Sequence, residues 1–227
     1  MSTQNIDIVI PIRLTREFAS ADNYFMGCIS HLQTNTRNFR PIFVDDNSDA
    51  VGQSVIETFA SNFSSGILIR THKQRWFTRA VNLGLRLVNT PWAVVLNSDT
   101  CVEEGWLEEL FAVREEFEKN RYLVGLVGSV YSPQDPRRFV ETRHPDFVTG
   151  HCWLLNMQAV KEVGYLDETT PKTIHIFSDN YLCYDMNRRG WRTVVSHYSK
   201  VLHEAGKSWG HQLHRIPNTL DAVNDQY

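Results

Sequence analysis

Short apolar runs alternate with longer amphipathic stretches along most of the chain. Short runs rich in Val and Ile predict buried strands, and apolar residues three or four positions apart predict helices with one buried face. The predicted strands are residues 6–11, 41–44, 66–70, 92–96, 123–130 and 147–155, with a last strand that begins at Val194. The predicted helices are residues 20–36, 51–63, 77–88, 103–119, 158–163 and 178–189. This alternation predicts an α/β fold with a mostly parallel sheet and right-handed crossovers.

Composition narrows the class of protein further. The 227 residues are 42% hydrophobic, which suits one large α/β domain or two closely packed halves. A formal charge of -3 gives no indication of a nucleic-acid-binding surface. The four cysteines have no C-x-x-C spacing, which argues against a structural zinc site. No signal peptide is evident and no apolar run approaches the ~20 residues of a membrane span, so we expect a cytoplasmic protein with reduced thiols.

The first candidate binding residues follow the predicted strand Trp92–Leu96, where the apolar run gives way to Asn97, Ser98 and Asp99. In open α/β sheets, ligands bind outside the carboxyl ends of the strands. A carboxylate at such an end is placed to hold a cation or a hydroxyl. The alternative is that Asp99 caps the element that follows, which is a common role for aspartate.

Two earlier strand ends repeat the pattern. The strand at 41–44 runs straight into Asp45-Asp46-Asn47-Ser48, a carboxyl-end loop whose alternative interpretation is a solvated turn. Pro11 cannot donate to a ladder and therefore marks the predicted end of the first strand, with Arg13 just after it. The chain has neither G-x-G-x-x-G nor G-x-x-x-x-G-K-[ST], which argues against nicotinamide cofactors and P-loop ATP hydrolysis.

The segments from residue 5 to about 210 resemble, in their order, the GT-A glycosyltransferases, especially the large inverting family-2 kind. The motifs that carry the resemblance are Val9-Ile10-Pro11, Val44–Ser48, Arg79–Gly84, Leu96–Asp99, Gly164–Glu168, Asp179 with Leu182, Cys183 and Gly190-Trp191, and His203 with Gly206 and Ser208. Each motif is short, and the specificity comes from their order and spacing.

The resemblance implies a single GT-A catalytic domain over residues 1–227. Its Rossmann-like, nucleotide-sugar-binding half would be residues 1–100, with a mixed, mostly parallel central sheet. An abutting acceptor-binding half would be residues 101–215, and residues 216–227 would form a tail.

The resemblance also implies a site. The residues expected to contact the nucleotide-sugar donor are Pro11, Arg13, Asp45, Asp46, Asn82, Asn97, Ser98 and Asp99. A divalent cation, Mn²⁺ or Mg²⁺, would neutralise the leaving diphosphate, with Asp99 and His203 as its protein ligands. His203 has the alternative interpretation of an ordinary loop histidine.

Asp179 is the expected general base, which accepts the proton of the acceptor hydroxyl. Its alternative is a carboxylate favoured by a helix N-terminus. Trp76, Trp153 and Trp209 are candidates to stack on the ligand, although aromatic residues more often belong to the core. His151, His211 and His214 are expected to be surface or packing residues.

Three motifs depart from the family pattern. Asn97 stands where the first Asp of the D-x-D motif is usual. The base motif usually reads Glu-Asp-x-Asp-Leu with a later Arg, and here those positions hold Ser178, Asp179, Asn180, Tyr181, Leu182 and Asp185. Gln74-Arg75-Trp76 replaces an Asn-x-Gly segment beside the nucleotide.

The sequence therefore predicts an inverting, metal-dependent glycosyltransferase that uses a nucleotide-activated sugar, with a UDP-sugar as the expected donor and an acceptor hydroxyl of unknown class. One alternative is a sugar nucleotidyltransferase, although residues 11–16 lack the glycine of a phosphate loop. The other is a catalytically silent module that binds sugar nucleotides or glycans. The oligomeric state stays open, a homo-oligomer included.

Overall fold

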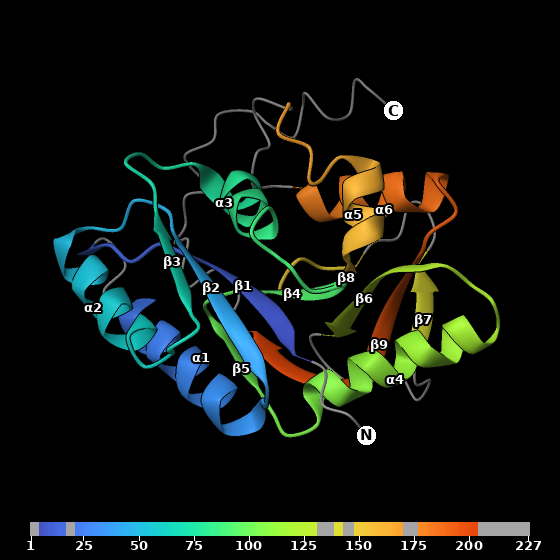
Figure 1. Cartoon of the computed structure of the whole chain (residues 1–227), viewed down its shortest axis with the longest axis horizontal. Coiled ribbons are helices and arrows are strands. Elements are labelled where there is room, and N and C mark those ends of the chain that lie inside the picture. Colours follow the sequence, from blue (N-terminus) through green and yellow to red (C-terminus); the bar gives the residue numbers. More distant parts are fainter. Residues whose placement is uncertain (1–4, 17–20, 131–138, 143–147, 170–176, 204–227) are drawn as a thin grey trace.

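The computed structural model describes residues 5–16, 21–130, 139–142, 148–169 and 177–203. Within these residues the strands form one mixed sheet in the order β3-β2-β1-β4-β8-β6-β9-β5, with β7 paired to β9 (Figure 1). The strands are β1 (Ile6–Ile12), β2 (Phe39–Asp45), β3 (Ile67–Arg70), β4 (Trp92–Leu96), β5 (Thr100–Val102), β6 (Val124–Val130), β7 (Phe139–Thr142), β8 (Cys152–Asn156) and β9 (Arg192–His203). The helices are α1 (Ala21–Asn35), α2 (Ala50–Ala60), α3 (Trp76–Leu85), α4 (Trp106–Lys119), α5 (Met157–Val163) and α6 (Ser178–Arg188). The predicted α/β class is confirmed.

The first four strands of the sheet are parallel. β1 lies between β2 and β4, and β3 extends the sheet beyond β2. Helices α1, α2 and α3 connect these strands, as the alternation of patterns predicts. The sheet then changes direction, because β8 runs antiparallel to both β4 and β6 while β9 runs parallel to β6.

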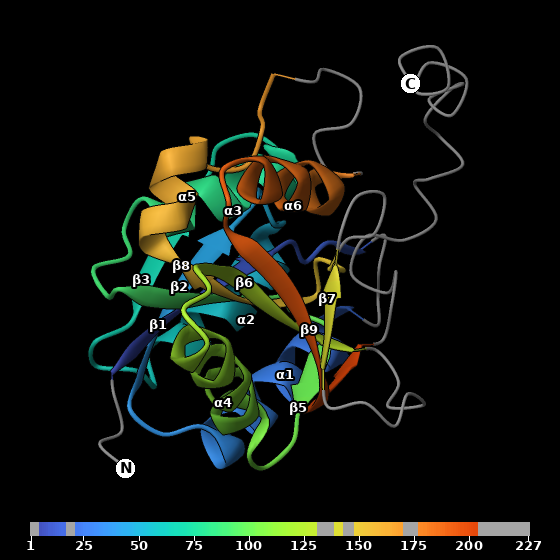
Figure 2. The same cartoon turned by 90° about the vertical axis from the view of Figure 1, so that its right-hand side faces the viewer.

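Two apolar layers hold the helices against the sheet. One contains Ile6, Ile8, Ile10 and Ile12 of β1 with buried residues of α1, α2 and α4, and the other contains Val9 with buried residues of α3, α5 and α6. Figures 1 and 2 show the two sets of helices on opposite faces of the sheet. Every second residue of β1 faces the first layer and Val9 faces the second, an alternation that is typical of a strand buried on both faces. None of the described helices is both long and apolar enough to cross a membrane.

Some element boundaries differ from the prediction. The last strand continues to His203, which pairs with Thr100 of β5, so His203 ends a strand and does not lie in a loop. Pro11 lies within β1, opposite Val44, and does not end the strand. A proline is accommodated there because β4 pairs with β1 only through Asp7–Val9, so the Pro11 position lies beyond the β4 side of the ladder.

Gly84 marks the tightest approach of α3 to the sheet. A Cβ added there would overlap Val9 Cγ1 and come within 3.1 Å of Val44 Cγ2. Both valines are fully buried and their β-branched side chains have little rotamer freedom. The helix therefore needs glycine at this position in spite of its low helix propensity.

We expect Gly84→Ala to lower the free energy of unfolding by about 1–3 kcal/mol, the usual cost of overpacking a core. The matched control is Gly27→Ala in α1, where an added Cβ meets only Cys101 Sγ at 3.9 Å. This control should gain up to about 1 kcal/mol from helix propensity. Urea unfolding of both variants tests the prediction, and equal effects would contradict it.

Candidate active site

The carboxyl ends of β1, β2 and β4 bring the predicted donor-binding residues to one edge of the sheet. Ile12 is paired with Asp45, and the Ile12 carbonyl accepts the N–H of Asp46 at 2.7 Å. The N–H of Leu14 donates to Ser48 Oγ at 2.9 Å, which ties the loop after β1 to the loop after β2. Loops fixed in this way form the usual ligand-binding edge of an open α/β sheet.

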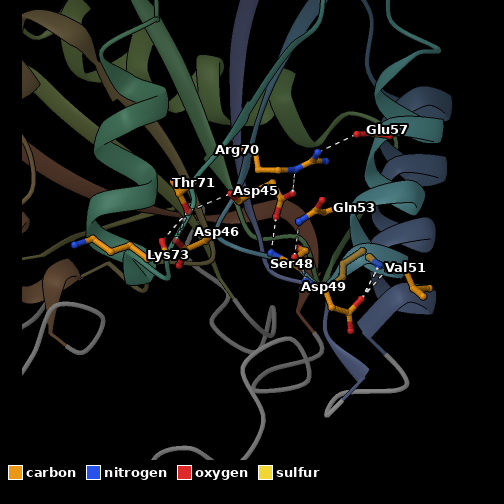
Figure 3. Close-up of polar contacts among 12 residues, drawn as sticks. Asp45, Asp46, Ser48, Asp49, Val51, Gln53, Glu57, Arg70, Thr71 and Lys73 are labelled. Atoms are coloured by element: carbon orange, nitrogen blue, oxygen red, sulfur yellow. Dashed lines mark hydrogen bonds and ion pairs between the residues drawn. The ribbon is translucent and has the colours of Figure 1, made fainter.

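Asp45 is buried and both of its carboxylate oxygens are engaged within the chain (Figure 3). Oδ2 accepts from Arg70 Nε at 2.7 Å, and Oδ1 accepts the Ser48 N–H at 2.9 Å. Arg70 in turn donates to Glu57 at 2.9 Å. These contacts make Asp45 a support for β3 and for the loop that follows β2, while its predicted contact with the donor stays a prediction.

Asp46 anchors the start of α3. Its carboxylate accepts the backbone N–H groups of Arg75 and Trp76 at 2.6 and 2.8 Å, and the Thr71 hydroxyl at 3.2 Å. Burial raises the pKa of Asp46, against the lowering effect of these donors and of nearby Arg13. The turn before α3 is thus fixed to the end of β2.

Trp76 has a left-handed backbone, with φ 67°. Few side chains other than glycine adopt this conformation, and strain of this kind is concentrated at functional sites. Trp76 stands where the family pattern has glycine, and its N–H is held by Asp46. Asp46 therefore holds a left-handed turn at the start of α3, and this turn carries a half-buried indole beside the end of β2.

Several of the buried polar atoms that have no hydrogen-bond partner among the described residues lie around this edge, whereas others, such as Arg114 Nε of α4 and His197 Nδ1 of β9, lie elsewhere. Those around the edge include Arg13 Nε and Thr15 Oγ1 after β1, Gln74 Nε2 and Thr78 Oγ1 around the start of α3, Asn97 Oδ1 after β4, and Asn180 Oδ1 at the start of α6. Leaving a buried polar group unsatisfied costs about 1–3 kcal/mol. A polar ligand bound at this edge would satisfy the atoms that lie there.

Asp99 and His203 face each other after β4. His203 Nε2 lies 3.2 Å from Asp99 Oδ1 and 3.4 Å from Asn97 Nδ2. Asp99 is 2% exposed, and Ser98 beside it is 5% exposed. The pairing of β5 with β9 is what brings His203 to this position.

These residues fit a divalent cation in part. The 3.2 Å separation between His203 Nε2 and Asp99 Oδ1 is close to the about 3.0 Å between adjacent ligands of an octahedral ion with bonds of about 2.1 Å. The buried Asn97 Oδ1 supplies a further oxygen. Among the described residues no group of three or more His, Cys, Asp or Glu side chains forms a complete set of ligands. Such a partial set suits an ion that also keeps phosphate oxygens.

His151 lies behind His203, although the sequence predicts only a surface or packing role for it. Its ring is 2% exposed, stacks on the His203 ring, and lies between the hydroxyls of Ser129 and Thr149. Burial lowers the pKa of His151 to about 3, with a further lowering by His203. His151 is therefore neutral at physiological pH.

The Asn82 side chain connects α3 to the Gly164–Glu168 turn by hydrogen bonds. Its Nδ2 donates to the Leu166 carbonyl at 2.9 Å and to Glu168 Oε1 at 2.7 Å, while Oδ1 accepts the Leu166 N–H at 3.1 Å. Both amide hydrogens are used inside the chain, and the side chain is 1% exposed. This geometry gives Asn82 a positioning role, and its predicted contact with the nucleotide stays a prediction.

Asp179 lies in the first turn of α6, after Phe177 with its left-handed backbone. Burial raises the pKa of Asp179, although the backbone N–H groups of Asn180 and Gly150 donate to the carboxylate. Gly150 immediately precedes His151, so one short segment separates Asp179 from the His203–Asp99 pair. The predicted base and the predicted metal ligands thus flank residues 150–151.

Trp153 is a core residue. It is fully buried, its indole N–H donates to the Val148 carbonyl at 3.1 Å, and its ring packs edge-on against Phe77. Several predicted positions lie outside the described residues, namely Gly206, Ser208, Trp209, His211, His214 and the 216–227 tail.

Comparison with known proteins identifies the family. The sequence model described as glycosyl transferase family 2 matches residues 21–164, which is more than half of the chain. None of the curated proteins matches the sequence.

Two similar solved structures share the fold. Residues 1–349 of S. aureus TarS are 12% identical with a TM-score of 0.66, and the match covers 94% of this chain and 64% of that one. The mannosyltransferase PcManGT from Pyrobaculum calidifontis, in complex with GDP-Man and Mn²⁺, is 15% identical with a TM-score of 0.68, covering 98% of this chain and 65% of that one. The chain thus spans about two thirds of the length of either structure. It belongs to glycosyl transferase family 2 and has the GT-A fold.

Proposed function

We propose that this protein transfers a sugar from a nucleoside-diphosphate sugar to an acceptor hydroxyl, with inversion at the anomeric carbon. The observation that carries the proposal is the Asp99–His203 pair at the carboxyl end of β4, separated from Asp179 by residues 150–151. In this assignment residues 1–100 hold the donor and residues 101–215 hold the acceptor.

The donor half offers hydrogen-bond donors for an anionic nucleotide. Arg13, just after β1, and Gln74, just before α3, each have a buried nitrogen without a hydrogen-bond partner among the described residues. Asp99, His203 and the amide oxygen of Asn97 would hold the cation, Mn²⁺ or Mg²⁺. When bound, that ion supplies positive charge to the departing diphosphate.

Asp179 removes the proton of the acceptor hydroxyl while the hydroxyl oxygen attacks the anomeric carbon. The new glycosidic bond forms on the face opposite the leaving group, the sugar–phosphate bond breaks, and the nucleoside diphosphate leaves with the bonding electrons. The raised pKa of Asp179 makes its ionised carboxylate a stronger proton acceptor than an ordinary aspartate.

The test is to incubate the purified protein with a panel of uridine, guanosine and thymidine diphosphate sugars, with Mn²⁺ or with EDTA, and to measure the released nucleoside diphosphate. We expect Mn²⁺-dependent release, with a UDP-sugar as the donor. Guanosine is in the panel because the PcManGT structure contains GDP-Man. Pyrophosphate release from a nucleoside triphosphate and a sugar phosphate would instead identify a nucleotidyltransferase. Donor binding without turnover in any acceptor mixture would identify a silent binding module.

We further propose that the Trp76 indole contacts the donor. Its backbone already has a glycine-type φ, so Trp76→Gly should leave the turn intact and remove only the ring. Stacking of an aromatic side chain on a base is worth about 1–3 kcal/mol, so affinity for the nucleoside diphosphate should fall about 5- to 150-fold.

Calorimetry with the nucleoside diphosphate identified by the panel measures this change in affinity. Trp76→Phe is the control, because it keeps an aromatic ring and should stay within a few-fold of the natural protein. Unchanged affinity in Trp76→Gly would show that the indole does not contact the donor.

A further inference from the structure

His151 and His203 form a stacked pair of imidazole rings. Their centroids are 5.2 Å apart and their planes differ by 11°. The two residues come from different parts of the fold, because His151 immediately precedes β8 and His203 ends β9. The His151 ring therefore offers a flat surface against which the His203 ring packs.

His151 is itself fixed from three directions. Its Nε2 lies 2.9 Å from Ser129 Oγ of β6, and its Nδ1 lies 3.1 Å from Thr149 Oγ1. Its carbonyl accepts the Asn97 N–H at 2.9 Å. Hydroxyl groups can donate or accept, so either tautomer of the His151 ring is satisfied. With both nitrogens engaged and 2% exposure, the ring has little freedom to rotate.

His203, in contrast, is the more exposed member of the pair. Its side chain is 17% exposed, and the nitrogen that faces Asp99 and Asn97 is the one expected to bind the cation. Rings that bind metal ions are usually held in orientation by neighbouring groups. Stacking on a fixed ring restricts the tilt of the His203 ring.

We propose that His151 is a positioning residue that holds the His203 ring so that its Nε2 atom and the Asp99 carboxylate face one divalent-cation site. This inference rests on the proposed function, which supplies the cation. It assigns a role to a residue for which the sequence predicts only packing. The main-chain bond to Asn97 links the same residue to the third candidate ligand.

The test is a titration of the full chain with Mn²⁺ alone, followed by electron paramagnetic resonance of the free ion. We expect His151→Ala to weaken Mn²⁺ binding about 10- to 100-fold, the usual effect of removing a group that orients a ligand. His151→Phe keeps a flat ring for His203 to stack on but loses both hydroxyl contacts, so it should weaken Mn²⁺ binding less than His151→Ala does. Ser129→Ala loosens the ring without removing it, and should weaken binding about 2- to 10-fold.

Turnover supplies a second measurement that a purely structural role would not move. The Mn²⁺ concentration for half-maximal nucleoside diphosphate release should rise in His151→Ala, while saturating Mn²⁺ should restore kcat. Val127→Ala is the matched control, because it shortens a buried side chain of β6, the strand that carries Ser129, and changes neither histidine nor the hydroxyls that contact them. This variant should be less stable but should bind Mn²⁺ normally.

The outcomes separate this inference from the proposed function. If the natural protein and His151→Ala bind Mn²⁺ equally, while Asp99→Asn and His203→Ala lose it, the positioning role is wrong and the cation site stands. Equal losses in His151→Ala and His151→Phe would also overturn the positioning role. If the natural protein neither binds Mn²⁺ nor releases nucleoside diphosphate, both proposals fail together.

Discussion

Replacing Asp179 with Asn is expected to lower kcat by about 10²–10⁴, the usual contribution of a general base. The variant keeps the size and polarity of the side chain but cannot accept a proton. Donor affinity should survive, because the proposed nucleotide and cation contacts lie on the other side of residues 150–151. Steady-state kinetics and calorimetry with the nucleoside diphosphate measure the two quantities separately.

The pH profile provides a further check on Asp179. Because burial raises its pKa, the carboxylate takes up a proton at a higher pH than an ordinary aspartate. Activity should therefore fall as the pH is lowered through that raised pKa, and this acid limb should disappear in Asp179→Asn.

Asp185→Asn is the matched control. Asp185 lies on the same helix, and burial raises its pKa too. Its replacement should leave kcat within a few-fold of the natural protein, since the proposed mechanism does not use it. Equal losses of kcat in the two variants would show that the base is not Asp179.

Replacing Asp99 with Asn is expected to weaken Mn²⁺-dependent donor binding, whereas Asp179→Asn is expected to lower kcat. The change removes the anionic candidate ligand of the cation, and even supporting residues of metal sites are worth about 10- to 100-fold in affinity. Mn²⁺-dependent donor binding should therefore weaken about 100-fold or more. Excess Mn²⁺ should restore part of it by mass action. Calorimetry of UDP and GDP binding, with and without Mn²⁺, measures the effect.

Glu103→Gln is the control for Asp99. Glu103 is exposed, lies just after β5, and pairs with Lys200 at 3.4 Å. Its replacement should leave Mn²⁺-dependent binding unchanged. If Asp99→Asn kept both binding and turnover while Asp179→Asn lost donor binding, the roles of the two aspartates would be reversed.

The parallel half of the fold could be predicted because its signals are local. Strands β1, β2 and β4 consist mainly of apolar residues, and carboxylates stand at the end of β2 and just after β4; the carboxyl ends of parallel strands share one edge of the sheet. The positions of Asp46 and Asp99 follow from this rule alone. A glycine inside a helix indicates that another segment approaches closely, but the sequence does not reveal that the neighbours of Gly84 are the side chains of Val9 and Val44.

The second half depends on contacts that sequence spacing does not reveal. β9 contains the polar residues Ser196, Tyr198 and Lys200. Its sequence therefore lacks the continuous apolar run that would predict a strand reaching to His203. The pairing with β5 that places His203 beside Asp99 joins residues about a hundred positions apart. Likewise, the residues next to His151 in the sequence do not indicate its role, because its contacts with Ser129 and His203 form only in the folded chain.

The central claim is that the carboxyl edge of β1, β2 and β4 binds a nucleoside diphosphate together with a divalent cation. Crystals of the protein soaked with Mn²⁺ and either UDP or GDP test it most directly, by anomalous diffraction at the manganese edge. The account predicts an anomalous peak within bonding distance of Asp99 and His203, with the diphosphate on the ion and the nucleoside toward Asp46 and Trp76. A nucleotide bound at another part of the molecule, or manganese away from Asp99, would contradict it.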